Sequence, residues 1–140
     1  MTQADVLVDL VHAIDTLDWD GVRAVLADRL TTDYTSLFGG SPVEQTGDEL
    51  VDQWRALLPG FTATQHLLGP VRVSGSSVRA HVRACHCVDE ARWIVAGHYR
   101  ATVTDDGRIS ALVLDTYYQD GDLDLPATAQ ERIAAGQVRG

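Results

Sequence analysis

The sequence predicts an α+β fold in which helices cover one face of a curved, mostly antiparallel sheet. Three observations predict it. Apolar residues recur at helical spacing in much of the first 60 residues, and from residue 61 to 118 the pattern changes to period two. Asp105-Asp106-Gly107 then marks a tight turn between the last two strands. Helices followed by a run of strands favour segregated layers, and a concave sheet lidded by helices encloses a pocket for a small apolar ligand.

Two helices are predicted at the start of the chain. Residues 3–17 place apolar side chains on one helical face, and Thr2 with Asp5 has the spacing of a capping box. Residues 18–30 continue as a second, short helix with Asp18 as its N-cap.

A strand and a third helix follow. Residues 31–38 are rich in threonine and aromatic residues, which predicts a strand, and residues 39–42 (Gly-Gly-Ser-Pro) end it. Thr46 and Glu49 form the clearest capping box in the chain, and they open a helix that Pro59-Gly60 ends.

The strands come next and define the domain. They are predicted at 61–68, at 70–88 with a break at 74–77, at 92–104 and at 108–118. Residues 1–120 are therefore expected to form a single domain, and residues 121–140 a C-terminal tail with a short helix.

Composition excludes several partners. The chain has 140 residues, a formal net charge of -9 and a sequence pI near 4.7. Such a surface repels phosphate backbones and anionic lipids, so neither nucleic acid nor a membrane is expected as a partner. No basic-then-apolar leader and no long apolar run is visible, which predicts a cytoplasmic protein.

The motif Cys85-His86-Cys87 suggests a metal site at first sight. Strand alternation places the two thiols on one face and His86 on the other, so the three cannot chelate one ion without a bulge. Two cysteines one residue apart on a strand also have poor geometry for a disulfide, which favours reduced thiols. We expect no metal and no cofactor.

Alternation along residues 78–88 assigns one histidine to the core. His86 shares a face with valine and alanine residues, whereas His81 shares the other face with arginines. Parity leaves both His66 and His98 ambiguous, because the two faces of their strands are similar.

Asp15 extends an apolar stripe of the first helix as a carboxylate. If buried, it needs a donor, since an unpaired buried charge costs several kcal/mol, roughly. We predict that His86 is this donor, because a carboxylate fixes the tautomer of a histidine and raises its basicity. The alternative is a satisfied core histidine and a surface aspartate, with Tyr34 and Trp54 as plain core aromatics.

Three segments together resemble a known family. "LDWDGVRAVLADRLTTDYTSL", "TATQHLLG" and "RACHC", followed by the final hairpin, resemble scytalone dehydratase. More broadly they resemble SnoaL-like members of the nuclear-transport-factor-like (ketosteroid isomerase-like) superfamily, over roughly residues 5 to 120. The resemblance implies a cone-shaped α+β barrel with an apolar pocket.

The resemblance also implies site residues. Scytalone dehydratase removes water from a cyclic hydroxyketone without a cofactor. Its motif histidine matches His66, its second pocket histidine matches His86, and the carboxylate that pairs with this second histidine matches Asp15. Tyr34 matches a tyrosine that holds the substrate carbonyl through water.

Other positions depart from the family and are expected to contact the substrate. Ile14 stands where the family has a second carbonyl-binding tyrosine. Ala96 replaces a pocket serine, and His98 replaces a pocket asparagine. Trp54 completes the predicted substrate-binding set.

The leading hypothesis is a cofactor-independent lyase (dehydratase) or isomerase acting on a small hydroxylated keto compound, of a polyketide-like or other secondary-metabolite class. In it, His66 abstracts a proton and Tyr34, with His98, stabilises the enolate. His86 then protonates the leaving hydroxyl.

Two alternatives remain open. One is a polyketide cyclase or epoxide hydrolase on the same fold, and for epoxide hydrolysis the resemblance implies a contribution from Asp115 and Arg100. A non-catalytic small-molecule binding module would need no acid–base pair.

We also expect a homodimer or homotrimer. The prediction rests on an outer sheet face that stays apolar, with Trp93, Val95, Tyr99 and Val103 on it.

Overall fold

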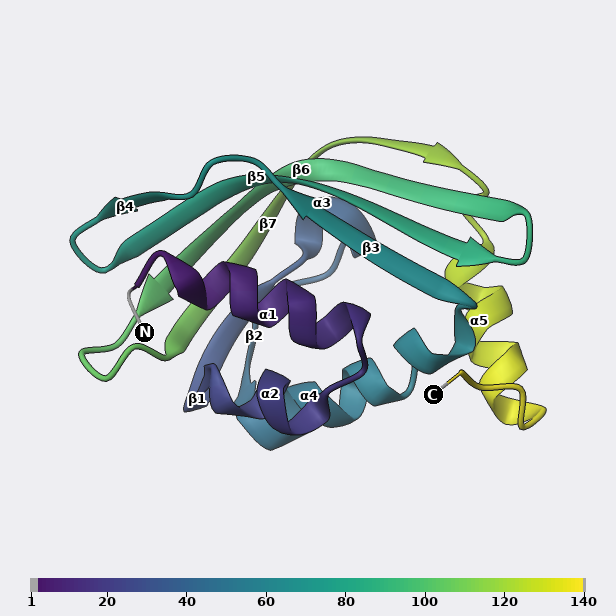
Figure 1. Ribbon diagram of the computed structural model, residues 1–140, viewed down its shortest axis with the longest axis horizontal. Helices are drawn as coiled ribbons and strands as arrows, with labels where there is room; N and C mark the ends of the chain where they lie inside the picture. Colours follow the sequence, from purple (N-terminus) through teal and green to yellow (C-terminus); the bar gives the residue numbers. More distant parts are fainter. Residues whose placement is uncertain (1–2, 140) are drawn as a thin grey trace.

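The fold consists of helices packed against one face of a mixed, mostly antiparallel sheet (Figure 1). The computed structural model describes residues 3–139. The predicted α+β class is confirmed, although the seven-stranded sheet is open and does not close into a barrel. Among residues 3–139, no helix combines the length and apolarity needed to cross a bilayer.

The sheet arches over the helices. Its strands lie in the order β2-β1-β7-β6-β5-β3, and β4 pairs with β5 outside this path. Only β1 and β7 pair in parallel among these neighbours. The strands are β1 (Leu26–Asp33), β2 (Val43–Thr46), β3 (Ala63–Leu68), β4 (Arg72–Ser74), β5 (Ser77–Val88), β6 (Ala91–Val103) and β7 (Ile109–Gly121).

The helices lie on the concave side of the sheet, as Figure 1 shows for α1, α2 and α4, and α5 lies at one end. The long amphipathic α1 buries most of its apolar side chains, with Val6 and Leu7 fully inaccessible and Val8 exposed. The helices are α1 (Asp5–Asp15), α2 (Trp19–Ala24), α3 (Thr35–Phe38), α4 (Gly47–Arg55) and α5 (Leu125–Ala134), with a 3₁₀ turn η1 at Leu58–Gly60.

The predicted capping box of α4 is confirmed. The Glu49 backbone N–H donates to Thr46 Oγ1 at 3.1 Å, while Glu49 Oε1 accepts from the Thr46 backbone N–H at 3.4 Å. The capping box predicted at Thr2 lies outside the described residues. The helix that follows begins at Asp5.

The second predicted helix is too long. It ends at Ala24, and the chain from Leu26 is already strand β1, because this segment pairs with β7 on one side and β2 on the other. The predicted strand at 31–38 correspondingly ends at Asp33. There the Asp33 carboxylate accepts from the Thr35 backbone N–H at 3.0 Å and turns the chain into α3.

The predicted faces of β5 are confirmed, but those of β6 are reversed. Val82 and Ala84 are buried as expected. Directly opposite residues of an antiparallel pair point to the same side, and Val95 lies opposite Ala84. Register with β5 therefore carries Trp93, Val95, Tyr99 and Val103 into the core, where each is 5% exposed or less.

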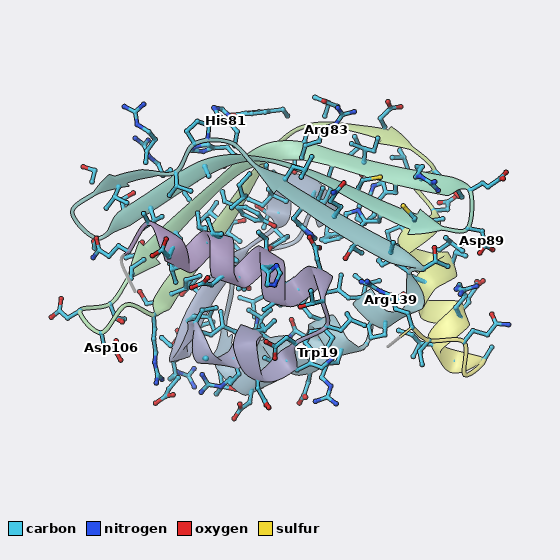
Figure 2. All side chains as sticks on the ribbon, viewed as in Figure 1. Trp19, His81, Arg83, Asp89, Asp106 and Arg139 are labelled. Atoms are coloured by element: carbon cyan, nitrogen blue, oxygen red, sulfur yellow. The ribbon has the colours of Figure 1, made fainter. Side chains whose placement is uncertain are left out.

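This reversal removes the observation on which the oligomer prediction rested. The outer face instead carries His81 and Arg83, which point away from α1 in Figure 2. Arg79 and Arg100, directly opposite each other, extend this polar face. A homodimer or homotrimer therefore stays a prediction without support from an apolar outer face.

Candidate functional site

A pocket of about 460 Å³ opens on the concave side of the sheet. Apolar and aromatic side chains make up most of its wall, and polar groups enter it at a few points, which is the usual character of small-molecule sites. Residues from α1, α3, α4, α5 and six strands contribute, among them Ile14, Tyr34, Trp54, Leu58, His66, Val82, His86, Trp93, Tyr99, Leu114, Pro126 and Gln130.

His66 lines this pocket and forms a hydrogen-bonded pair with Asp15, which borders a separate, shallow depression. Asp15 Oδ1 lies 2.7 Å from His66 Nδ1, and Asp15 Oδ2 accepts from the His66 backbone N–H at 2.8 Å. The side chains are 7% exposed for His66 and 20% for Asp15. A carboxylate can only accept here, so Nδ1 carries the proton and the other ring nitrogen, Nε2, remains available.

The predicted partner of Asp15 was therefore wrong. Asp15 is the last residue of α1, and α1 packs against β3, which lies at the edge of the sheet. An edge strand has free backbone N–H groups, and the carboxylate satisfies the one at His66. Asp15 thus bonds the strand that carries His66, whereas His86 lies one strand further in, on β5.

A further chain of hydrogen bonds holds the carboxylate in place. Thr64 Oγ1 donates to Asp15 Oδ1 at 3.0 Å, and Arg139 Nη2 donates to Thr64 Oγ1 at 2.9 Å. Burial acts to raise the pKa of Asp15, but the bonds from His66 and Thr64 outweigh it and hold this pKa below its ordinary value. Asp15 is therefore a stable anion near neutral pH.

The Arg139 contribution was not predicted from the sequence. Its Nη1 also donates to the backbone carbonyl of Asp15 at 3.1 Å, so the C-terminal tail returns to the end of α1. Figure 2 shows Arg139 on the concave side, beside the helices. No periodic or capping signal marks this residue, because its role depends entirely on where α5 directs the tail.

His86 lies inside the pocket wall, as alternation predicted, and is 6% exposed. Its ring packs between Phe61 and Trp93, with ring centroids 5.1 and 4.3 Å away, and lies 5.6 Å from the His66 ring. His86 Nδ1 lies 3.0 Å from the Trp93 carbonyl, which can only accept, so Nδ1 carries the proton. Burial, with nearby His66 as a second cause, lowers the pKa of His86 to about 4.

Two phenols approach each other in the same pocket. Burial raises the pKa of Tyr34 well above its ordinary value, and the neighbouring Tyr99 adds to the shift. The pKa of Tyr99 is raised as well, chiefly by burial. Both groups therefore stay protonated and can donate to a ligand oxygen. Trp54 and Ile14 also line the pocket.

Two predicted substrate-binding residues lie elsewhere. His98 stands directly opposite His81, and Ala96 directly opposite Arg83, so both point to the outer face of the sheet. Their predicted contact with a pocket ligand is wrong, for the register reason that reversed the faces of β6.

The ion pair considered for epoxide hydrolysis is also outside the pocket. Asp115 lies next to Leu114, whose side chain lines the pocket, so it faces the other way. Arg100 Nε donates to Asp115 Oδ2 at 2.7 Å on the outer face, where both side chains are about half exposed.

One part of the pocket wall is polar, which the sequence analysis did not predict. Gln45 Nε2 donates to Thr32 Oγ1 at 3.1 Å, and Gln53 Nε2 donates to Gln45 Oε1 at 2.6 Å. All three residues line the pocket. The signal was weak, because β2 has only four residues and its inward glutamine breaks the apolar pattern.

The lowered pKa of His86 predicts an acid-sensitive fold. The unfolded chain binds a proton at this residue below about pH 6.5, whereas the folded chain does so only below about 4. Stability is therefore lost as the pH falls through this window, by about 2 kcal/mol between about pH 7.5 and about pH 5. Asp15 adds no slope there, because its contribution is lost only below the ordinary aspartate pKa.

Urea unfolding at a series of pH values measures this slope. His86→Asn keeps a donor for the Trp93 carbonyl and should flatten the slope, while His81→Asn on the outer face should leave it unchanged. An equally steep slope in His86→Asn would contradict the assignment.

Comparison with known proteins places this geometry in a family. The SnoaL-like domain family matches the chain over residues 4–110. The chain belongs to the SnoaL-like domain family. No functionally curated protein matched the sequence.

Solved structures share the fold of this SnoaL-like protein. The Kfla4162 protein from Kribbella flavida is 28% identical, with 89% of this chain and 94% of that chain covered and a TM-score of 0.78. An epoxide hydrolase of the LEH-like type from M. tuberculosis is 17% identical, with 96% and 92% covered and a TM-score of 0.68.

A candidate scytalone dehydratase from Novosphingobium aromaticivorans is 18% identical, with 84% of this chain and 83% of that chain covered and a TM-score of 0.65. At such identities the last two likenesses show the fold alone. The resemblance stated from the sequence is confirmed at the level of the SnoaL-like family.

Proposed function

We propose that this SnoaL-like protein is a cofactor-independent acid–base enzyme, a dehydratase or isomerase, acting on a small hydroxylated ketone. The observation that carries the proposal is the hydrogen bond between Asp15 and His66, a residue that lines a mostly apolar pocket. A carboxylate that holds one nitrogen of a buried imidazole leaves the other nitrogen as a base of fixed tautomer.

His66 is the proton-transfer residue in this mechanism. Its Nε2 takes a proton from the carbon next to the substrate carbonyl, and Asp15 stabilises the imidazolium that forms. The same proton then passes to the departing hydroxyl, giving water and an enone, or to another carbon, giving an isomer. One positioned base contributes ~10²- to 10⁴-fold to such a step.

The phenols of Tyr34 and Tyr99 supply the hydrogen bonds that the developing enolate oxygen needs. Because burial raises the pKa of Tyr34, this phenol keeps its proton and donates without ionising. The neighbouring Tyr99 also lines the pocket. This assignment replaces the expected contribution of His98.

His86 takes a different role from the one expected from the sequence. A histidine with a pKa of about 4 is neutral near pH 7 and does not act as a proton donor to the leaving hydroxyl. With Nδ1–H donated to the Trp93 carbonyl, its Nε2 is an acceptor. We assign it to orienting a substrate hydroxyl.

The test is a panel of small cyclic β-hydroxyketones and ketones with exchangeable α-protons. Enone formation is followed by absorbance, and α-proton exchange in D₂O by NMR. Turnover by the wild type that His66→Asn lacks supports the proposal. Compounds that bind, by thermal shift, yet show neither reaction would contradict it and favour a binding module.

Removing the Tyr34 hydroxyl is expected to lower kcat by ~10²- to 10³-fold, the usual effect of losing an oxyanion donor. Tyr34→Phe keeps the ring that packs in the wall, so KM should change little. Steady-state kinetics on the best panel substrate measure both constants. A Tyr34→Phe protein with unchanged kcat would move the oxyanion role to Tyr99.

A further inference from the structure

The two cysteines form a pair on the outer face of the sheet that the proposed reaction does not use. Cys85 Sγ and Cys87 Sγ lie 4.0 Å apart, and both residues are partly buried free thiols. Residues i and i+2 of a strand point the same way about 6.6 Å apart, so these side chains have turned toward each other.

The neighbouring strands build a shallow site around the thiols. Gln65 lies directly opposite Cys85, and Ala63 directly opposite Cys87, on the β3 side. On the β6 side, Arg92 lies opposite Cys87. These residues share one depression with the cysteines, and Thr64 and Asp15 border it. The small Ala63 side chain leaves room beside the thiols.

Two thiols side by side favour a ligand whose central atom binds both sulfur atoms at once. Within residues 3–139, no third histidine, cysteine or carboxylate joins them in a metal-binding cluster. Burial, with the neighbouring Cys87 as a further cause, raises the pKa of Cys85, so at least this thiol is protonated near neutral pH.

A direct disulfide requires a much closer approach than the present 4.0 Å. A trivalent arsenic atom spans two As–S bonds instead of one S–S bond, so it fits with less movement of the strand. We propose that Cys85 and Cys87 form a dithiol site for trivalent organic arsenicals, behind the pocket wall.

The binding step balances without a redox partner. An arsenoxide, R–As=O, reacts with the two thiols so that two As–S bonds form. The two thiol protons leave with the arsenoxide oxygen as water. Arsenic stays trivalent, and neither sulfur is oxidised.

Phenylarsine oxide added to the reduced, folded protein tests the site. Mass spectrometry should show one phenylarsine group per chain, resistant to excess 2-mercaptoethanol and removed by dimercaptopropanol. Since the chain has two cysteines, Cys85→Ser and Cys87→Ser each leave one As–S bond. Each variant should bind phenylarsine oxide at least ~10²-fold more weakly than the wild type, because the second As–S attachment is lost.

The midpoint of thermal unfolding distinguishes binding to the folded protein from a reaction with the unfolded chain. A ligand held by the folded strand raises the midpoint, whereas one held only by the unfolded chain lowers it. A lowered midpoint in the wild type would overturn the proposal, as would adducts of the single-serine variants that resist the monothiol equally well.

Discussion

Asp15→Asn is expected to lower kcat by ~10²- to 10⁴-fold, with the Kd for pocket ligands nearly unchanged. The carboxylate accepts the His66 Nδ1 proton, which leaves Nε2 as the ring nitrogen available to a substrate. An asparagine has one acceptor and one donor in place of two acceptors, so it no longer enforces this tautomer or stabilises the imidazolium. The loss is that of one positioned acid–base group.

Two measurements separate this effect from a loss of structure. Asp15 also accepts the His66 backbone N–H at the sheet edge, so the variant should lose about 1–3 kcal/mol of stability yet remain folded. Asp20→Asn, on the exposed surface, makes the same change of charge and should retain full turnover. Full turnover in a folded Asp15→Asn protein would show that the Asp15–His66 pair has no part in the mechanism.

Gly60→Ala is expected to cost on the order of 3 kcal/mol and to detach the C-terminal helix. A Cβ at Gly60 would lie 2.0 Å from the Ala129 carbonyl oxygen and 2.6 Å from its carbon. These are backbone atoms of α5, so no side-chain rotation relieves the contact. Because Pro126 and Gln130 of α5 line the pocket, the same change should open one end of it.

Urea unfolding and limited proteolysis measure the two consequences. Cleavage should move into residues 122–139 in Gly60→Ala, since η1 and the tail lose contacts such as the bond from Arg132 Nε to the Gly60 carbonyl. Gly69→Ala is the matched control, because its added Cβ would meet His81 Cβ at an ordinary 3.5 Å. Wild-type stability in the Gly60→Ala protein would mean that α5 can pack in an alternative position.

Local signals predicted the elements whose residues carry a complete pattern. The capping box at Thr46, the turn at Gly107 and the alternation of β5 each depend on neighbours within a few residues. The boundary at Leu26 failed because its apolar spacing suits a helix and a strand equally, and pairing with β7 decided between them.

The sequence indicated residues of the candidate site, but it did not indicate which of them are hydrogen-bonded to each other. Asp15, His66 and His86 lie close together, as the sequence suggested, but the hydrogen bonds join Asp15 to His66. His98 was placed in the pocket on resemblance, although parity could not assign it. The contribution of Arg139 could not be predicted, because a contact made by the C-terminal tail produces no periodic pattern in the sequence.

By itself the sequence determined the α+β class, the inward position of His86 and the direction of Cys85 and Cys87, opposite to that of His86, on the same strand. Each of these follows from side-chain direction along a single helix or strand. Only the tertiary structure decided the partner of Asp15, the inward face of β6 and the closure of the pocket by α5. Those depend on register and packing between distant segments, which no local period encodes.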